Sequence, residues 1–184
     1  MEKQAYSGKA AEILDAAERH MRAGGYDAVS FRDLADQVGI KSSSVHYHFP
    51  QKADLGEAVV RRYTEAVLEA LAAPDDPAEN AYARIERLCA VYRSALIDDG
   101  LICLCCVLGA ETRDLPEQVA AAVDQFFERV HGWASRAVAD AKGQGPSGTM
   151  IVASLQGAMI LAMAMKNDDL FDEIVAGILA QFAA

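Results

Sequence analysis

The chain has 184 residues and a formal net charge of −10, from 17 Lys and Arg against 27 Asp and Glu. Apolar residues make up 52% of it, Gly and Pro number only 13 and 5, and alanine, the strongest helix former, is abundant. This composition predicts an all-helical globular protein and excludes the disordered, collagen-like and disulfide-stapled classes. The length fits one large domain, or a small domain joined to a larger one.

The sequence predicts a cytoplasmic protein with no membrane partner. The N-terminal 20 residues hold no apolar run of signal-peptide length. The most membrane-like stretch, residues 150–165, is shorter than the roughly 20 residues that a span needs, so we expect a buried helix there. Without an export signal, the cysteines at positions 89, 103, 105 and 106 are expected to be reduced thiols.

The negative charge is unevenly distributed. Residues 1–64 hold nine basic and nine acidic side chains, so the whole of the −10 lies in residues 65–184. From Gly39 to Lys52 there is no acidic residue at all. Such an asymmetry predicts different partners for the two parts of the chain, although a neutral patch arising by chance would look the same.

Helix signals fill the first 71 residues. Helical spacing of apolar residues predicts helices over residues 9–21, 31–38, 42–49 and 53–71. Gly24 and Gly25 end the first helix, and Ser30 is a good N-cap for the second. Gly39 supplies a tight break before the third, and Pro50 ends it.

The rest of the chain reads as helix after helix. We expect helices over residues 80–97, 101–110, 119–137, 149–165 and 170–182, with loops at residues 74–77 and 143–148. Residues 101–110 carry no charge and are expected to form a buried helix, and Pro116 suits the first turn of the helix that follows.

Two short helices joined by a glycine turn make a helix-turn-helix. Apolar residues that could hold such a pair together are Leu34, Ala35, Val38, Ile40 and Val45. The second helix would present hydroxyl, imidazole and ammonium groups, from Lys41, Ser42, Ser43, Ser44, His46, Tyr47 and His48. A helix of this kind can enter the major groove and contact base edges and phosphates. An ordinary helical hairpin with a serine-rich surface is the alternative.

Residues 24–55, GGYDAVSFRDLADQVGIKSSSVHYHFPQKADL, resemble the DNA-binding signature of the TetR family of bacterial transcriptional regulators. The resemblance implies an effector-responsive repressor: a homodimer that binds a palindromic operator in double-stranded DNA and leaves it when a small molecule binds. It also implies a three-helix helix-turn-helix domain over residues 1–52, and a larger helical ligand-binding and dimerisation domain over residues 53–184.

Within the motif, His48, Phe49, Lys52 and Leu55 match the family directly, and Ser43 and Ser44 stand where Gly-Thr is usual. His46 departs from a phosphate-contacting Tyr, with Tyr47 in the variable position beside it. Lys41 departs from a capping Ser or Thr, so we expect Ser42 to take over the cap. The predicted DNA-binding residues are Ser30, Arg32, Lys41, Ser42, Ser43, Ser44, His46, Tyr47, His48 and Lys52.

The larger domain offers candidate residues for the effector and the dimer. Its few aromatic and basic residues favour an apolar or weakly polar effector, with Cys89, Tyr92, Cys103, Cys106 and Trp133 as pocket candidates. Two helices that could form the dimer carry Val119, Val123, Phe126, Phe127, Val130, Ile151, Leu155, Met159 and Ala162. The core of a single subunit is the alternative for the same residues.

The clustered cysteines admit two further hypotheses. They could sense oxidants, or Cys105 or Cys106 could pair with His131 in a redox-responsive or hydrolytic enzyme. The nearest charges, Asp98, Asp99 and Glu111, are acidic and would raise a thiol pKa, which favours inert buried cysteines. No ligand spacing for a metal and no cofactor motif is visible, so we expect neither, and the protein is not expected to be an enzyme.

Overall fold

The computed structural model describes residues 6–141 and 145–182, and all the regular structure in those ranges is helical. The prediction of an all-helical protein is therefore confirmed. The α-helices are α1 Lys9–Gly24, α2 Phe31–Val38, α3 Ser42–His48, α4 Lys52–Leu71, α5 Ala81–Ile97, α6 Leu104–Ala110, α7 Glu117–Ala137, α8 Gly148–Met165 and α9 Asp169–Ala180. Short 3-10 turns lie at Tyr26–Ala28 and Ala139–Ala141.

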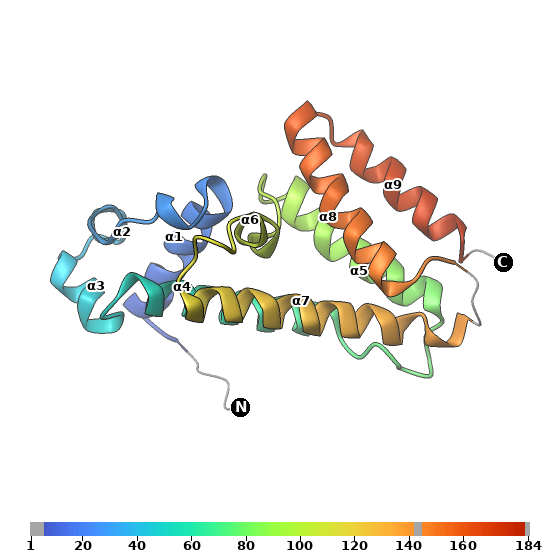
Figure 1. Ribbon diagram of the computed structural model, residues 1–184, viewed down its shortest axis with the longest axis horizontal. Helices are drawn as coiled ribbons and strands as arrows, with labels where there is room; N and C mark the ends of the chain where they lie inside the picture. The colour runs from blue at the N-terminus through green and yellow to red at the C-terminus, as the bar shows by residue number, and fades with distance from the viewer. Residues whose placement is uncertain (1–5, 142–144, 183–184) are drawn as a thin grey trace.

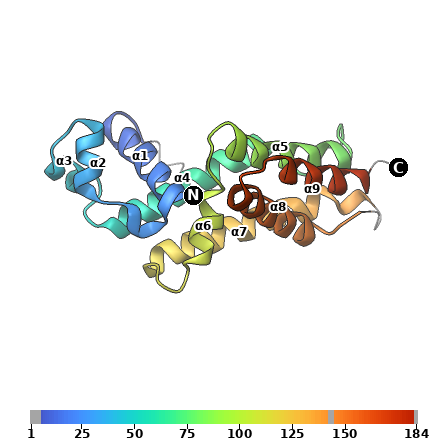
Figure 2. The same ribbon diagram turned by 90° about the horizontal axis from the view of Figure 1, so that it is seen from above.

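The molecule is elongated, with a small group of helices at one end and a larger bundle at the other (Figure 1). Helices α1, α2 and α3 form the small group, which we call the head. Helices α5, α8 and α9 lie at the far end, α6 lies between, and α4 runs beside α7 along the length of the molecule (Figure 2). Buried apolar residues form one continuous cluster from α1 to α9. A domain boundary at residue 52 stays a prediction.

Local sequence signals set the two short helices of the head. The Ser30 hydroxyl accepts a hydrogen bond from the Asp33 backbone N–H at 3.4 Å, the expected N-cap of α2. Gly39 ends α2 in the left-handed conformation, with φ 71°, a backbone geometry that side chains with a Cβ disfavour. Helix α3 ends at His48, two residues before Pro50. Both helices lie within one residue of their predicted bounds.

The helix predicted over residues 101–110 begins only at Leu104. The Arg22 guanidinium of α1 donates hydrogen bonds to the carbonyl oxygens of Leu101 and Ile102, at 3.0 and 2.9 Å. Residues 101–103 therefore cross towards the head instead of joining the helix. A contact between segments distant in sequence overrides the local helix preference here.

Helix α8 is long and apolar enough to cross a membrane, judged by length and composition alone. We predicted that this helix would be buried, but only 39% of its 18 residues are buried in the chain, so the prediction is wrong for most of the helix. The physical reason is that α5, α7 and α9 cover only part of its circumference. Ile160 and Leu161 stay half-exposed, at 51% and 50%.

Candidate functional site

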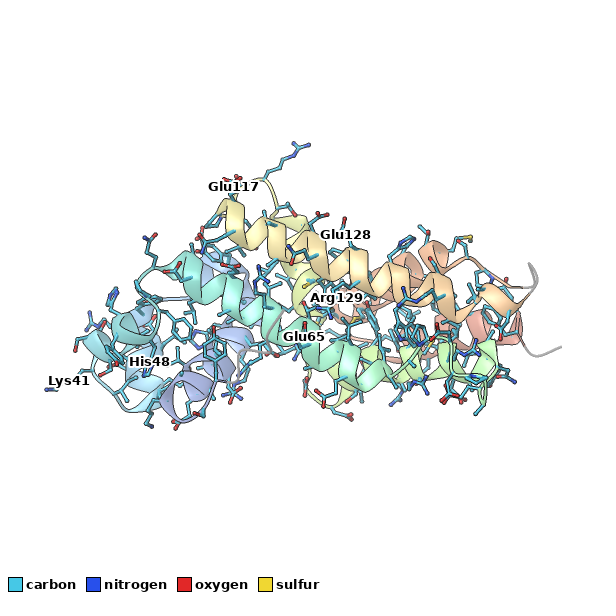
Figure 3. All side chains as sticks on the ribbon, turned by 90° about the horizontal axis from the view of Figure 1, so that it is seen from below. Lys41, His48, Glu65, Glu117, Glu128 and Arg129 are labelled. Carbon is cyan, nitrogen blue, oxygen red and sulfur yellow. The ribbon has the colours of Figure 1, made fainter. Side chains whose placement is uncertain are left out.

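The outer face of α3 is the candidate nucleic-acid surface. Val45 of α3 and Leu34 of α2 are fully buried and hold the two helices together. The exposed side chains around α3 are Lys41, Ser42, Ser43, His46, Tyr47 and His48, with Ser44 half-buried. Figure 3 shows Lys41 at the tip of the head, with His48 nearby. The face offers hydrogen-bond donors and a cation without a carboxylate, the chemistry that contacts phosphates and base edges.

The neighbouring rings of His46 and Tyr47 differ in how far they are exposed. His46 packs edge-on against Phe31, with ring centroids 4.7 Å apart, and its Nδ1 lies 3.4 Å from the Pro50 carbonyl oxygen. Tyr47 is 84% exposed and contacts the His48 ring edge-on. Tyr47, in the position that varies in the family, is therefore the aromatic side chain that projects furthest into solvent.

The start of α3 differs from the expectation. Lys41, not Ser42, occupies the N-cap position, and it makes no side-chain capping bond. Its backbone carbonyl accepts from the Ser44 N–H at 2.8 Å instead. The prediction that Ser42 takes over the cap is wrong, because Ser42 already lies in the first helical turn. The Lys41 ammonium is thus not involved in capping.

Lys52 is the first residue of α4, and its side chain contacts the turn that follows α1. Its ammonium lies 4.5 Å from the Tyr26 ring centroid and 3.4 Å from an Asp27 carboxylate oxygen. Asp27 is fully exposed, a neighbour that sequence reasoning missed because it lies 25 residues away. Arg32, in the first turn of α2, is exposed. Ser30 uses its hydroxyl to cap α2.

A buried arginine joins the head to the larger bundle. Arg22 of α1 donates to the carbonyl oxygens of Ile102, Leu101 and Ala95 at 2.9, 3.0 and 3.2 Å, and to the Asp99 carboxylate at 2.8 Å. Its side chain is only 5% exposed. Nothing in the local sequence distinguishes Arg22 from the exposed Arg19 of the same helix, so this role could not be predicted.

A second contact joins the other end of α6 to the head. The Glu111 carboxylate, just after α6, accepts a hydrogen bond from the Tyr26 backbone N–H at 2.9 Å. Gly25 permits the approach, since a Cβ there would lie 2.0 Å from a Glu111 carboxylate oxygen. Helix α6 is therefore held to the head at both ends, through Arg22 before it and Glu111 after it.

The predicted pocket residues separate into three groups. Tyr92 and Cys103 line an internal cavity of about 10 Å³, enough for about one water molecule. Cys106 lines a larger groove elsewhere. Cys89 and Trp133 line neither; the Trp133 indole instead donates to the Ala72 carbonyl at 2.8 Å. The remaining residues around the cavity are Tyr63, Val67, Val91, Ala95 and Phe126.

An open groove of about 450 Å³ lies between α6, α7 and α8. Its lining residues are Cys106, Gly109, Phe127, His131, Thr149, Val152, Ala153 and Gln156. Gln156 was absent from the sequence-based candidates, because a lone amide in an apolar helix gives no recognisable signal. The volume is within the range of small-molecule sites.

The thiols lack the environment of a reactive cysteine. Burial raises the pKa of Cys89 to about 12 and, together with the neighbouring Cys103, that of Cys106 to about 11. Burial also raises the pKa of Cys105 well above its usual value. His131 lines the same groove as Cys106, but its Nε2 lies 2.8 Å from the Thr149 hydroxyl. These thiols are protonated at neutral pH, which favours the inert interpretation.

The residues proposed for the dimer interface lie inside the subunit. The buried ones are Val119, Val123, Phe126, Val130, Ile151, Leu155, Met159 and Ala162, and Phe127 is half-buried. Their burial favours the alternative that they form the core of one subunit. The large apolar side chains that remain exposed on α8 and α9 are Met150, Ile160, Leu161, Met163, Met165 and Ile174.

The sequence of the head is similar to known regulatory proteins. The profile of the bacterial regulatory proteins of the tetR family matches residues 13–59, from α1 into α4. The HTH-type transcriptional repressor KstR2 of Rhodococcus jostii is 34% identical over 59 residues, which are 32% of this chain and 29% of that protein. The chain thus aligns with less than a third of the length of that relative.

Two solved structures align with almost the whole chain. A TetR-family transcriptional regulator from Agrobacterium tumefaciens is 26% identical, with a TM-score of 0.87 over 96% of this chain and 98% of that one. A TetR transcriptional regulator from Legionella pneumophila is 24% identical, with a TM-score of 0.83 over 95% and 97%, and shares the fold. The head therefore resembles the tetR family of bacterial regulatory proteins, and the whole chain shares its fold with TetR-family regulators of known structure.

Proposed function

We propose that the protein is a homodimeric, effector-responsive transcriptional repressor of the cytoplasm that binds a palindromic operator and is released by a small apolar ligand. The observation that carries the proposal is the outer face of α3, which is exposed at the tip of the head and free of carboxylates. A short helix of this kind fits the major groove, with its N-terminal residues on base edges. Lys41, Ser43 and Tyr47 are the leading contact candidates.

The acidic larger bundle supports specific rather than general DNA binding. Exposed carboxylates such as Glu117 and Glu128 lie along α7, behind the head (Figure 3). Negative charge there repels phosphate except where the head docks. Binding to random DNA should therefore be weak, and operator binding should fall steeply as salt rises.

The exposed apolar face of α8 and α9 supports a second copy of the chain as its partner. Single exposed apolar residues are ordinary, but Ile160, Leu161 and Ile174 on two contacting helices are a concentration of them. A second copy would bury this face and account for the membrane-like composition of α8. Two heads are also what a palindrome requires, with recognition helices about 34–36 Å apart.

Repression and release by a ligand rest on the family and on the cavities. The relative KstR2 is named a transcriptional repressor, and this chain resembles it in the head. In a dimer, the distance between the two heads decides whether both can bind the operator. A ligand that binds more tightly to a form with an unsuitable distance lowers operator affinity by the ratio of its affinities for the two forms. The groove and the internal cavity are the candidate ligand sites.

In vitro selection from a random duplex library tests operator binding by the full chain. We expect an enriched inverted repeat whose half-site centres lie about 10 base pairs, or a multiple, apart. Lys41→Ala should weaken binding to this repeat and reduce the slope of log K against log salt by about 0.9, the value of one phosphate contact. Glu128→Ala, on the far surface of α7, is the matched control. Failure to enrich any repeat would remove the DNA-binding proposal.

The oligomeric state tests the α8 and α9 face. We expect a dimer in sedimentation equilibrium, and Ile160→Lys should shift it to monomer and abolish cooperative binding to the repeat. Ala121→Lys, at an exposed position of α7, introduces the same charge elsewhere and should leave the dimer intact. A dimer that survives Ile160→Lys unchanged would place the interface on another surface.

A further inference from the structure

A small polar cluster of uncharged side chains lies inside the larger bundle. Gln156 Nε2 donates to the Tyr92 hydroxyl at 3.1 Å and lies 3.8 Å from the Cys103 thiol. Tyr63, Tyr92 and Cys103 line the internal cavity, whereas Gln156 lines the groove. Gln156 is therefore the residue that stands between the two spaces.

The other end of the same amide is unsatisfied. Gln156 Oε1 is buried and has no hydrogen-bond partner in the described structure. A buried acceptor without a donor costs about 1–3 kcal/mol, so native proteins retain few of them without a reason. Exchanging the two ends of the amide would let the Tyr92 hydroxyl donate to the oxygen but would leave a buried N–H without an acceptor. In the orientation of this structure, the cluster is one donor short.

The groove that leads to Gln156 is lined mostly by apolar groups. Among its lining residues, Phe127, Val152, Ala153 and Gly109 provide the apolar surface, and no lysine or arginine is present. Its His131 already contacts Thr149. A carboxylate or phosphate entering here would lose water without gaining a cation, which is strongly unfavourable. The charge of the groove therefore selects against anionic ligands.

Resting on the effector response proposed above, we infer that Gln156 is the polar recognition residue of the effector site and that the effector is an uncharged, mainly apolar molecule with one hydroxyl or N–H donor. Its apolar body occupies the groove between α6, α7 and α8. Its donor binds Gln156 Oε1 and completes the cluster with Tyr92 and Cys103. Because Gln156 Oε1 is buried in this structure, the donor reaches it only when the side chains around the amide shift.

This inference predicts a preference between closely matched molecules. A ligand with a hydroxyl satisfies Oε1, whereas the same ligand as a methyl ether brings a second acceptor against it. The hydroxyl ligand gains a hydrogen bond and leaves no acceptor unsatisfied, so it should bind about tenfold or more tightly than the ether. Removing the acceptor from the protein should abolish that preference without abolishing the apolar binding.

Isothermal titration of the full chain with 4-propylphenol, its methyl ether and 4-propylbenzoate tests the inference. We expect the phenol to bind at least about tenfold more tightly than the ether, and the benzoate to bind most weakly. In Gln156→Leu the ratio of phenol to ether affinity should fall to about one. Ser154→Ala, two residues away on α8, removes a polar group outside the groove lining and should keep the wild-type ratio.

A second variant guards against a Gln156 substitution that disturbs folding. Ala153 is exposed and lines the groove, so Ala153→Phe should fill it and abolish binding of the phenol and the ether without lowering the melting temperature. Equal affinities for phenol and ether in the wild type, tightest binding of the benzoate, or no binding of any probe would each overturn the inference. Operator binding measured on the same samples separates these results from a failure of the proposed function.

Discussion

Arg22 should be the most destabilising single position to alter in the contact between the head and the larger bundle. In Arg22→Met the apolar stem is kept but four hydrogen bonds are lost. The Asp99 carboxylate is 53% exposed and recovers water, so its loss contributes little. The Ala95 carbonyl keeps the Leu101 N–H as a donor, so only the carbonyls of Leu101 and Ile102 are left without a partner. At about 1.5 kcal/mol for each unsatisfied acceptor, the two give about 3 kcal/mol.

Thermal unfolding followed by circular dichroism at fixed protein concentration measures this cost. A chain of 184 residues has an unfolding entropy of about 0.4 kcal/mol/K, so a loss of about 3 kcal/mol lowers the melting temperature by about 8 °C. Arg22→Lys should fall in between, because an ammonium cannot reach all four acceptors from one position. Arg19→Met, at an exposed position of the same helix, should change the melting temperature by no more than about 1 °C. Equal melting temperatures for Arg22→Met and Arg19→Met would refute the reasoning.

Three further substitutions or titrations probe the head and the thiols. Asp27→Asn removes a carboxylate that pairs with Lys52 and should tighten operator binding about two- to fivefold in a salt-dependent way, an effect that should vanish in a Lys52→Ala background. Gly39→Ala should lower the free energy of unfolding by about 1–2 kcal/mol through its positive φ alone, because a Cβ there meets nothing within 4 Å. Gly132→Ala, inside α7, should instead raise it by about 0.5–1 kcal/mol. Urea unfolding of both variants shows whether the two changes have opposite signs. Alkylation of Cys106 by iodoacetamide, followed by peptide mass mapping, should accelerate about tenfold per pH unit from pH 7 to 10, since its pKa is raised to about 11; a plateau near pH 8.5 would contradict that value.

The head was predictable because its determinants are local. Ser30 bonds to an N–H three residues away, Gly39 supplies its own backbone conformation, and Pro50 restricts the residue before it. Each signal acts within one turn of chain, so the bounds of α2 and α3 follow from the sequence. The same locality explains why the resemblance to the TetR family was detectable there.

The larger bundle was less predictable because its determinants lie far apart in the chain. Arg22 meets Leu101 and Ile102 some 80 residues away, which no periodicity reveals, and the predicted helix lost its first turn to that contact. Helix α8 is apolar on all sides, so the pattern could not show which side α5, α7 and α9 cover. The same ambiguity led to the interface prediction for residues such as Val123 and Leu155, which are buried within one subunit.

The position of α6 supplies a route from the groove to the head. Cys106 and Gly109 of α6 line the groove, and the contacts on either side of the helix, through Arg22 and Glu111, bind it to α1 and to the turn that follows. A ligand that displaces α6 must stretch or break at least one of these contacts. The coupling free energy between ligand binding and operator binding is therefore limited by the strength of these contacts.

Glu111→Gln weakens one of them with little change in shape. The amide oxygen still accepts from the Tyr26 N–H, but the bond loses its charge assistance, which roughly halves its strength. We expect the Kd of 4-propylphenol to change less than twofold. The factor by which saturating phenol weakens operator binding should fall severalfold, as measured by fluorescence anisotropy. Glu128→Gln, the same change at an exposed position of α7, is the control. Since coupling is reciprocal, the operator must weaken phenol binding by the same reduced factor. A factor in Glu111→Gln equal to that of the wild type would show that the phenol acts on operator binding by another route.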